Sequence, residues 1–189
     1  MLDDLSEPLA FLLAIISVAV AFLPNLANPI GGFLLPTLAF AIAIIPHELA
    51  HRGTARRFGC WSRFVLYPPG FYTTLAVNLV MGFIVHSPLL FIAGYTAISC
   101  AGYTRRDEGM ISLAGPLTNI AIALISLAYL RFPVYLPLFS FFYLLLKLNA
   151  FVAFFNLLPL GPLDGAKIFR WNIAIWAILI IIAGWLWLA

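Results

Sequence analysis

The chain has 189 residues, of which 64% are hydrophobic and 9% are charged, and its formal net charge is +3. Soluble domains usually carry about 25% charged residues, so a chain this apolar cannot cover its surface in water and needs the lipid bilayer as its solvent. This composition excludes a water-soluble enzyme. The length suits a single membrane-embedded domain over residues 1–189, without a separate soluble module.

The first element follows an acidic start that contains Asp3, Asp4 and Glu7. A secretory signal would need a basic start and a small-residue cleavage site, so we expect the first apolar run to remain in the mature protein. A spanning helix needs about 20 mostly apolar residues. The fourth, fifth and sixth runs reach that length, whereas the first and third are short. The six runs cover residues 9–23, 33–50, 71–85, 111–130, 134–155 and 171–188.

Basic residues indicate how these runs are oriented. A basic cluster follows the second run, whereas the link at residues 24–32 carries no charge. By the positive-inside rule the basic side is cytoplasmic, so the second helix runs inward and the N-terminus is cytoplasmic too. We expect the cluster to contact anionic lipid headgroups and not nucleic acid. The cluster consists of Arg52, Arg56, Arg57 and Arg63.

The stretch at residues 64–103 is rich in Phe, Tyr, Val, Ile and Thr and contains several glycines, a composition that favours strands. An open sheet edge cannot face lipid. We therefore expect a helical or re-entrant piece at residues 71–85, followed by a short strand pair at residues 89–99 that neighbouring helices shield. Such a strand could bind an extended substrate by strand addition. The fold class is then an all-α polytopic membrane protein with about five to six transmembrane helices and a small membrane-associated strand element.

The second run ends in the sequence HELAH, which places histidines at positions 47 and 51. Residues four apart lie on one face of a helix, so both imidazoles can reach one metal ion. Zinc with two histidines and one carboxylate keeps a fourth position open for water, and Glu48 can take the proton of that water. A chance match is the alternative, but a glutamate at the end of an apolar helix is costly unless it has a function.

A third ligand follows from counting the seven acidic residues. The N-terminal tail holds three of them, and Asp107 and Glu108 follow two arginines in a polar turn. Only Glu48 and Asp164 then remain among the apolar runs, where ionisable residues are functional candidates. Pro159, Gly161 and Pro162 interrupt the apolar stretch before Asp164, and irregular backbone at membrane depth must line protein or a cavity. The alternative is a surface turn in which Asp164 is the N-cap of the last helix.

These motifs together resemble those of a known family. HELAH at residues 47–51 is followed by AGPLTN at residues 114–119 and by NLLPLGPLDG at residues 156–165. In this combination the sequence resembles the site-2 protease family of intramembrane zinc metalloproteases. The resemblance covers residues 47–165, which we take as the catalytic core. It implies one zinc ion, bound by His47, His51 and Asp164.

The same resemblance implies further roles and partners. Glu48 would be the general base, and the amide of Asn156 would stabilise the oxyanion. The substrates would be membrane-spanning proteins, cut in regulated intramembrane proteolysis, and the multi-pass enzyme would have its active site towards the cytoplasmic side. The sequence leaves the physiological substrate, the cleaved bond and the oligomeric state open.

Two other readings of the motifs differ in their ligands. Membrane proteases that process prenylated proteins need a downstream glutamate, and no acid other than Asp164 is present in the later runs. A transporter or scaffold with a structural zinc site would want a fourth protein ligand, which only His86 could supply.

Other polar residues and both cysteines are expected to be structural. His86 stands alone after an apolar run, and Asn78 and Asn149 are expected to form hydrogen bonds between helices. Asn119 is the second-choice polar group for the site, after Asn156. The cysteines, at positions 60 and 100, show no metal-binding spacing, and we expect apolar fillers rather than a disulfide.

Overall fold

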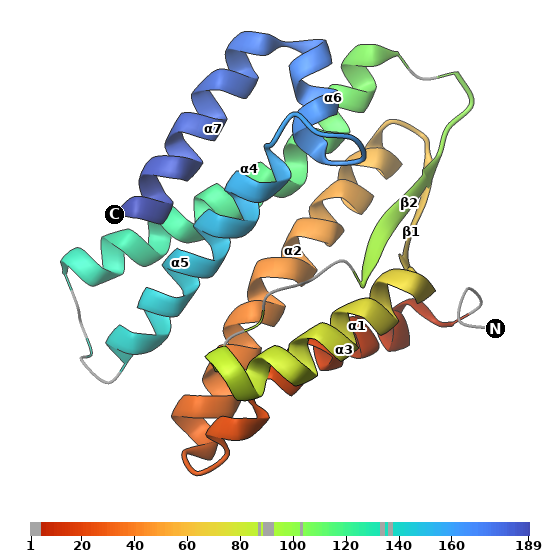
Figure 1. The fold of residues 1–189 in the computed structure, drawn as a ribbon. Helices are drawn as coiled ribbons and strands as arrows, with labels where there is room; N and C mark the ends of the chain where they lie inside the picture. The colour runs from red at the N-terminus through yellow and green to blue at the C-terminus, as the bar shows by residue number, and fades with distance from the viewer. Residues whose placement is uncertain (1–4, 87, 89–92, 103, 133–134, 136–137) are drawn as a thin grey trace. The chain divides into compact units, whose positions relative to one another are not determined.

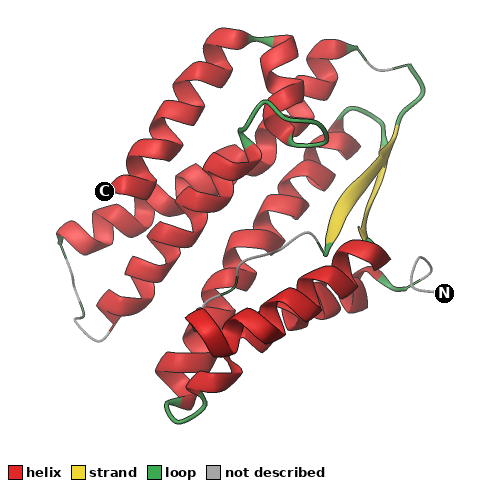
Figure 2. Ribbon diagram, viewed as in Figure 1, coloured by secondary structure: helices red, strands yellow, loops and turns green. Residues whose placement is uncertain are grey.

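The computed structural model describes residues 5–86, 88, 93–102, 104–132, 135 and 138–189. This part of the chain contains seven α-helices, two short helical segments of other types and a sheet of two strands (Figures 1 and 2). The chain forms two compact units, Met1–Ala41 with Arg63–Ala97, and Ile42–Ser62 with Ile98–Ala189. The division falls within the second helix and within both strands.

Five helical segments are long and apolar enough to cross a membrane. They are Glu7–Asn25, Pro29–Arg57, Pro68–Val85, Arg105–Arg131 and Phe139–Asn156. The expected fold class, an all-α polytopic membrane protein with five to six spans and a small strand element, is confirmed by this arrangement.

The first unit begins with α1 (Glu7–Ala19), which continues into a 3₁₀ segment, η1 (Val20–Asn25). A single π-helical segment, η2 (Pro29–Leu34), then leads into α2 (Leu35–Arg57). The apolar runs that were short in the sequence reach spanning length because η1 extends α1, and because α3 (Pro68–Val85) begins before its apolar run.

Small and polar groups hold α1, η1 and α3 together. A Cβ on Gly82 would lie 2.6 Å from the backbone oxygen of Ala21, so only glycine permits this close approach. One turn earlier on α3, the buried amide of Asn78 donates to the Ser17 carbonyl at 3.2 Å. The prediction that Asn78 forms a hydrogen bond between helices is thereby confirmed.

The two strands are β1 (Trp61–Leu66) and β2 (Gly94–Ser99). We expected a helical piece at residues 71–85, and α3 confirms it. Of the strand pair expected at residues 89–99, the part at residues 89–92 lies outside the described residues, whereas the later part forms β2, whose described partner is β1 and not a strand within that stretch. The alternation of side chains along β1 explains this, since Ser62, Phe64 and Leu66 are buried on one face.

The second unit contains the C-terminal part of α2 and four further helices. These are α4 (Arg105–Arg131), α5 (Phe139–Asn156), α6 (Asp164–Trp171) and α7 (Ile173–Leu188). Helices α4, α5 and α7 lie side by side (Figure 1), and α6 packs on α4 and α7. Fully buried alanines at this contact let the helix backbones approach closely. They are Ala123, Ala150, Ala153 and Ala183.

The sixth apolar run, residues 171–188, forms α7 except for its first two residues, so the helix is shorter than the run suggested. Asn172 has extended backbone angles and caps α7, because its side-chain oxygen accepts from the backbone N–H groups of Ala174 and Ile175. Helix α7 therefore begins at Ile173, directly after α6 ends at Trp171, and has 16 residues. The capping ability of asparagine outweighs the apolar character of the residues around it.

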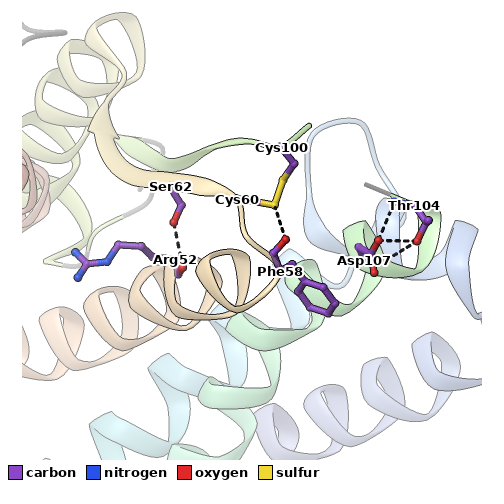
Figure 3. Close-up of a disulfide and its surroundings, with 7 residues drawn as sticks. All are labelled: Arg52, Phe58, Cys60, Ser62, Cys100, Thr104 and Asp107. Carbon is purple, nitrogen blue, oxygen red and sulfur yellow. Dashed lines mark hydrogen bonds between the residues drawn. A yellow bond between two sulfur atoms is a disulfide. The ribbon is translucent and has the colours of Figure 1, made fainter. Parts of the chain in front are cut away.

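The two cysteines form a disulfide, which contradicts their expected role as separate apolar fillers (Figure 3). Cys60 immediately precedes β1 and Cys100 immediately follows β2, so the pairing of the strands brings them together. The bridge packs beside Ala55 of α2 and Ile111 of α4. No local pattern could reveal it, because the two residues are 40 positions apart in the sequence.

Reduction of this disulfide should lower the stability of the folded protein. A bridge across this separation restricts the unfolded chain and typically contributes about 2–4 kcal/mol. Thermal unfolding in detergent should show a lower midpoint with reductant, and the Cys60→Ser/Cys100→Ser variant should have that lower midpoint with or without reductant. Alkylation of the denatured, unreduced protein should label no thiol; two labelled thiols would contradict the bridge.

Candidate metal centre

Three side chains that the sequence singled out lie together in the second unit. The Nε2 atoms of His47 and His51 are 3.0 Å apart, and Oδ2 of Asp164 lies 3.4 Å from the first and 3.0 Å from the second. Their exposed fractions are only 3%, 6% and 9%. Among the described residues they form a group whose ligand atoms lie within 4.8 Å of one another.

Helix α2 supplies both imidazoles. The helix continues without interruption through Pro46, so the two histidines keep the four-residue spacing that places them on one face. Their rings are nearly perpendicular, at 79°, with centroids 4.6 Å apart. This arrangement directs the two Nε2 atoms towards one point.

The carboxylate comes from the first turn of α6. Asp164 is buried and begins the helix, with Leu163 as the capping residue, so the alternative of a surface turn capped by Asp164 is wrong. Gly165 permits this position, because a Cβ there would contact the backbone oxygens of Leu157 and Leu158, the second at 2.5 Å. The start of α6 can therefore lie against the end of α5.

Both imidazoles are held through their other ring nitrogen. His51 Nδ1 lies 2.8 Å from the Ile111 carbonyl, and His47 Nδ1 lies 2.5 Å from Oδ1 of Asn119. A carbonyl oxygen only accepts, so Nδ1 of each ring is the donor and Nε2 keeps its lone pair for a metal. The sequence offered Asn119 only as a second choice, and no sequence pattern indicated the Ile111 carbonyl.

Gly115 of α4 lets the two imidazoles lie close to the backbone of this helix. A Cβ at this position would clash with Nε2 of His51 and would lie 2.6 Å from Nε2 of His47. Any larger residue at position 115 would therefore displace the rings. Two nitrogens and one carboxylate oxygen form a donor set that fits a zinc site with three protein ligands.

Comparison with known proteins decides the family. The chain is 35% identical over 179 residues to MJ0611 of Methanocaldococcus jannaschii, with 88% of this chain and 85% of that protein covered. It is 31% identical over 152 residues to Rip2 of Mycobacterium tuberculosis, and 30% identical over 134 residues to Rip3 of the same species. All three carry the name "putative zinc metalloprotease".

The chain belongs to the site-2 protease family of zinc metalloproteases. The match to Rip2 covers 71% of this chain and 56% of Rip2, and the match to Rip3 covers 68% of this chain and 28% of Rip3. No family model and no solved structure matches the chain. Its apolar helices and its family together make it an integral membrane protein with zinc metalloprotease chemistry.

The two residues with expected catalytic roles lie beside the ligand-bearing elements. Glu48 follows His47 directly on α2 and is half-buried. Asn156 is the last residue of α5, and its amide donates to the Val152 carbonyl at 3.0 Å within the same helix. Their roles as base and oxyanion donor stay predictions.

The remaining histidine is not part of the group. His86 belongs to the first unit, where it ends α3 in a left-handed conformation with φ of 54°. Within the described residues, the candidate ligand group therefore consists of three side chains and not the four that a closed structural zinc site prefers.

Replacing Gly115 by alanine should weaken zinc binding while the helix is retained. The added Cβ would clash with both Nε2 atoms, and alanine favours a helix by about 1 kcal/mol over glycine. We expect a loss of zinc affinity at least as large as the ~10–100-fold typical of changes around metal ligands, measured by competition with a chelator.

The matched control is Gly53→Ala on α2, where a Cβ would meet nothing within 4 Å. This variant should keep the zinc affinity of the unmodified protein. Equal affinities of the two variants would show that metal binding does not depend on the close approach of the imidazoles to Gly115.

Proposed function

We propose that this protein hydrolyses peptide bonds of membrane-spanning proteins, within the bilayer or at its edge, in regulated intramembrane proteolysis. The observation that carries the proposal is the buried meeting of His47, His51 and Asp164, because a carboxylate and two imidazoles at the end of an apolar span are costly without a function. The family membership supports the same chemistry.

One zinc ion would be held by these three side chains. Zinc in such a site supplies Lewis-acid activation of water and of the scissile carbonyl. The Nδ1–H groups of both histidines, bound to the Ile111 carbonyl and to Asn119, keep the rings turned so that Nε2 faces the ligand group. The family relationship favours zinc over other metals that accept the same ligands.

Glu48 would act as the general base. It is adjacent to His47 on α2 and half-buried, so its carboxylate can reach a water molecule near the ligand group while remaining in a partly apolar setting. It would take the proton of the attacking water and deliver a proton to the departing amine.

Asn156 would donate a hydrogen bond to the developing oxyanion, an effect typically of about 2.7–4 kcal/mol for one donor. Its present partner, the Val152 carbonyl, lies in a helix and is the normal acceptor for the backbone N–H four residues later. The side-chain bond is therefore additional, and the amide can release it to a substrate.

The substrate is proposed to be a transmembrane protein segment that unwinds first, because backbone hydrogen bonds close a helix to hydrolysis. An unwound segment could pair with β2 as an additional strand. We favour β2 over β1, because β1 pairs with β2 and its Phe64 N–H already binds the Glu7 carboxylate at 3.0 Å. The positive-inside rule supports an active site on the cytoplasmic side.

A structural zinc site is the competing proposal. It would need a fourth protein ligand, whereas three ligating side chains gather among the described residues. The catalytic proposal therefore has the stronger support, and the following two variants separate it from the structural one.

Changing Glu48 to glutamine should leave zinc binding intact and abolish cleavage. Glutamine keeps the size of the side chain but cannot accept a proton, and loss of a general base typically costs ~10²–10⁴-fold in rate. Cleavage of a single-span substrate reconstituted in liposomes with the protein would be measured, together with the zinc content.

The control is Glu108→Gln, the same chemical change on α4, where the carboxylate faces the Arg170 guanidinium at 3.9 Å near the surface. Undiminished cleavage by the Glu48 variant would eliminate the base role. A loss of zinc in that variant would instead point to a role in metal binding.

Changing Asp164 to asparagine should weaken zinc binding by more than ~100-fold, since even changes around metal ligands cost ~10–100-fold. Asparagine preserves the shape but removes the negative ligand. Affinity would be measured by chelator competition on detergent-purified protein. Asp107→Asn, at the exposed start of α4, serves as the matched control. Full zinc occupancy in the Asp164 variant would move the third ligand elsewhere.

A further inference from the structure

Three hydrogen-bonded side chains lead from α5 through α4 to the metal centre. We propose that Asn149 sets the orientation of the Asn119 amide, and that Asn119 in turn sets the tautomer of His47. Asn119 would then be a positioning residue for the metal, acting through His47, and Asn149 a second positioning residue acting through Asn119. The proposal rests on the proposed function in one respect, which is that His47 ligates a metal.

We call the chain of hydrogen bonds from Asn149 through Asn119 to His47 the relay, and its contacts are short and continuous. Asn149 Nδ2 donates to the Leu145 carbonyl at 2.9 Å, and Asn149 Oδ1 accepts from Asn119 Nδ2 at 2.8 Å. Asn119 Oδ1 lies 2.5 Å from Nδ1 of His47. Both asparagines have an exposed fraction of 0%. Solvent therefore cannot replace any of these partners.

The direction of the relay follows from the group at its far end. The Leu145 carbonyl is a backbone oxygen that only accepts, so the Asn149 amide must turn its NH₂ group towards it. The Asn149 oxygen then faces Asn119. A flip of the Asn149 amide would place an oxygen against an oxygen at the Leu145 contact and would leave a buried donor without this acceptor, a costly change in a dry interior.

Asn119 receives its orientation from two acceptors at once. Its NH₂ group has two hydrogens, and these go to the Asn149 oxygen at 2.8 Å and to the Ala43 carbonyl at 2.7 Å. Both acceptors lie on the same side of the amide, so the remaining oxygen must face His47. The acceptor that His47 meets is thus determined two steps away, on α5.

The consequence for His47 is a single neutral tautomer. An oxygen at Nδ1 requires that this nitrogen carries the hydrogen, which leaves the lone pair on Nε2 beside His51 and Asp164. A flipped Asn119 amide would present a donor to Nδ1 instead. The hydrogen would then move to Nε2, where it would point into the ligand group and oppose metal binding.

The second imidazole shows why a relay is needed for the first. His51 Nδ1 donates to the Ile111 carbonyl, a backbone acceptor that cannot reverse its polarity. An asparagine side chain can flip, because its oxygen and nitrogen have nearly the same shape. Asn149 and the Ala43 carbonyl together give the Asn119 amide the fixed polarity that a backbone carbonyl has by nature.

The test reads the tautomer directly in metal-free protein. The chain contains only three histidines, so ¹⁵N-histidine NMR of the detergent-purified apoprotein can resolve the nitrogens of His47. We expect a single tautomer with hydrogen on Nδ1 in the unmodified protein. Asn149→Leu should produce a mixture of tautomers at His47 and lower the zinc affinity about 10-fold, and Asn119→Leu should lower it by ~10–100-fold.

A conservative variant separates orientation from packing. In Asn119→Asp both side-chain atoms are acceptors, so His47 meets an oxygen however the group is turned. This variant should keep the tautomer of His47 and most of the zinc affinity, and adding Asn149→Leu to it should cause no further loss. The matched control is Asn78→Leu, a buried asparagine of the first unit, which should lower stability but leave zinc affinity and the tautomer unchanged.

Two results would overturn the relay. The first is a single Nδ1–H tautomer at His47 in both Asn119→Leu and Asn149→Leu. The second is an Asn149→Leu effect on zinc affinity that is as large in the Asn119→Asp background as in the unmodified protein. If Asn119→Leu fails to fold, the Asn149→Leu and Asn119→Asp variants carry the test alone.

Failure of the relay is distinguishable from failure of the proposed function. If Asp164→Asn abolishes zinc binding while the asparagine variants leave the tautomer unchanged, the metal site stands and the relay is wrong. If the unmodified protein binds no zinc, the proposed function is wrong, and the NMR spectrum of the apoprotein still decides the relay.

Discussion

The constraint on which this structure depends is the cost of a polar group in an apolar chain. The core of the second unit is built from apolar side chains, yet its interior also contains two imidazoles, a carboxylate and two amides. Each needs a partner inside the protein, because lipid cannot supply one and these side chains are largely shielded from bulk water. The contacts among them are therefore determined by complementarity of donors and acceptors, and the apolar helices serve to hold the donors and acceptors in register.

The same cost explains how much the sequence could predict. An acidic residue among apolar runs is rare, so elimination among seven acids led to Asp164, and the HELAH spacing led to His47 and His51. The helices themselves were equally accessible, because long apolar runs have few alternative structures at membrane depth. The helix boundary at Asn172 was not predicted, because mean hydropathy does not reveal a single capping residue. The side chain of Asn172 caps the start of α7.

Contacts between distant segments were beyond the sequence. The pairing of β1 with β2 depends on a partner some thirty residues away, and the disulfide depends on that pairing, so neither has a local pattern. The role of Asn119 could be predicted only in part. It stood out as a polar residue in an apolar helix, but only the meeting of α2, α4 and α5 reveals that it faces His47 on one side and Asn149 on the other.

Helix α4 shows how a segment without a metal ligand can define a metal site. Gly115 and Asn119 are four residues apart, so they lie one turn apart on the same face of α4. The glycine lets the two Nε2 atoms approach the helix backbone closely, and the asparagine accepts from the Nδ1 side of the His47 ring. One turn before Gly115, the Ile111 carbonyl orients the ring of His51. Three successive turns of one helix thus supply an acceptor, a site of close backbone approach and a second acceptor. The spacing of these groups along α4 matches that of the two histidines along α2, since both follow the 5.4 Å pitch of the α-helix. A change in the register between α2 and α4 would move all three groups away from their partners together, so the metal centre depends on this helix pair as a unit.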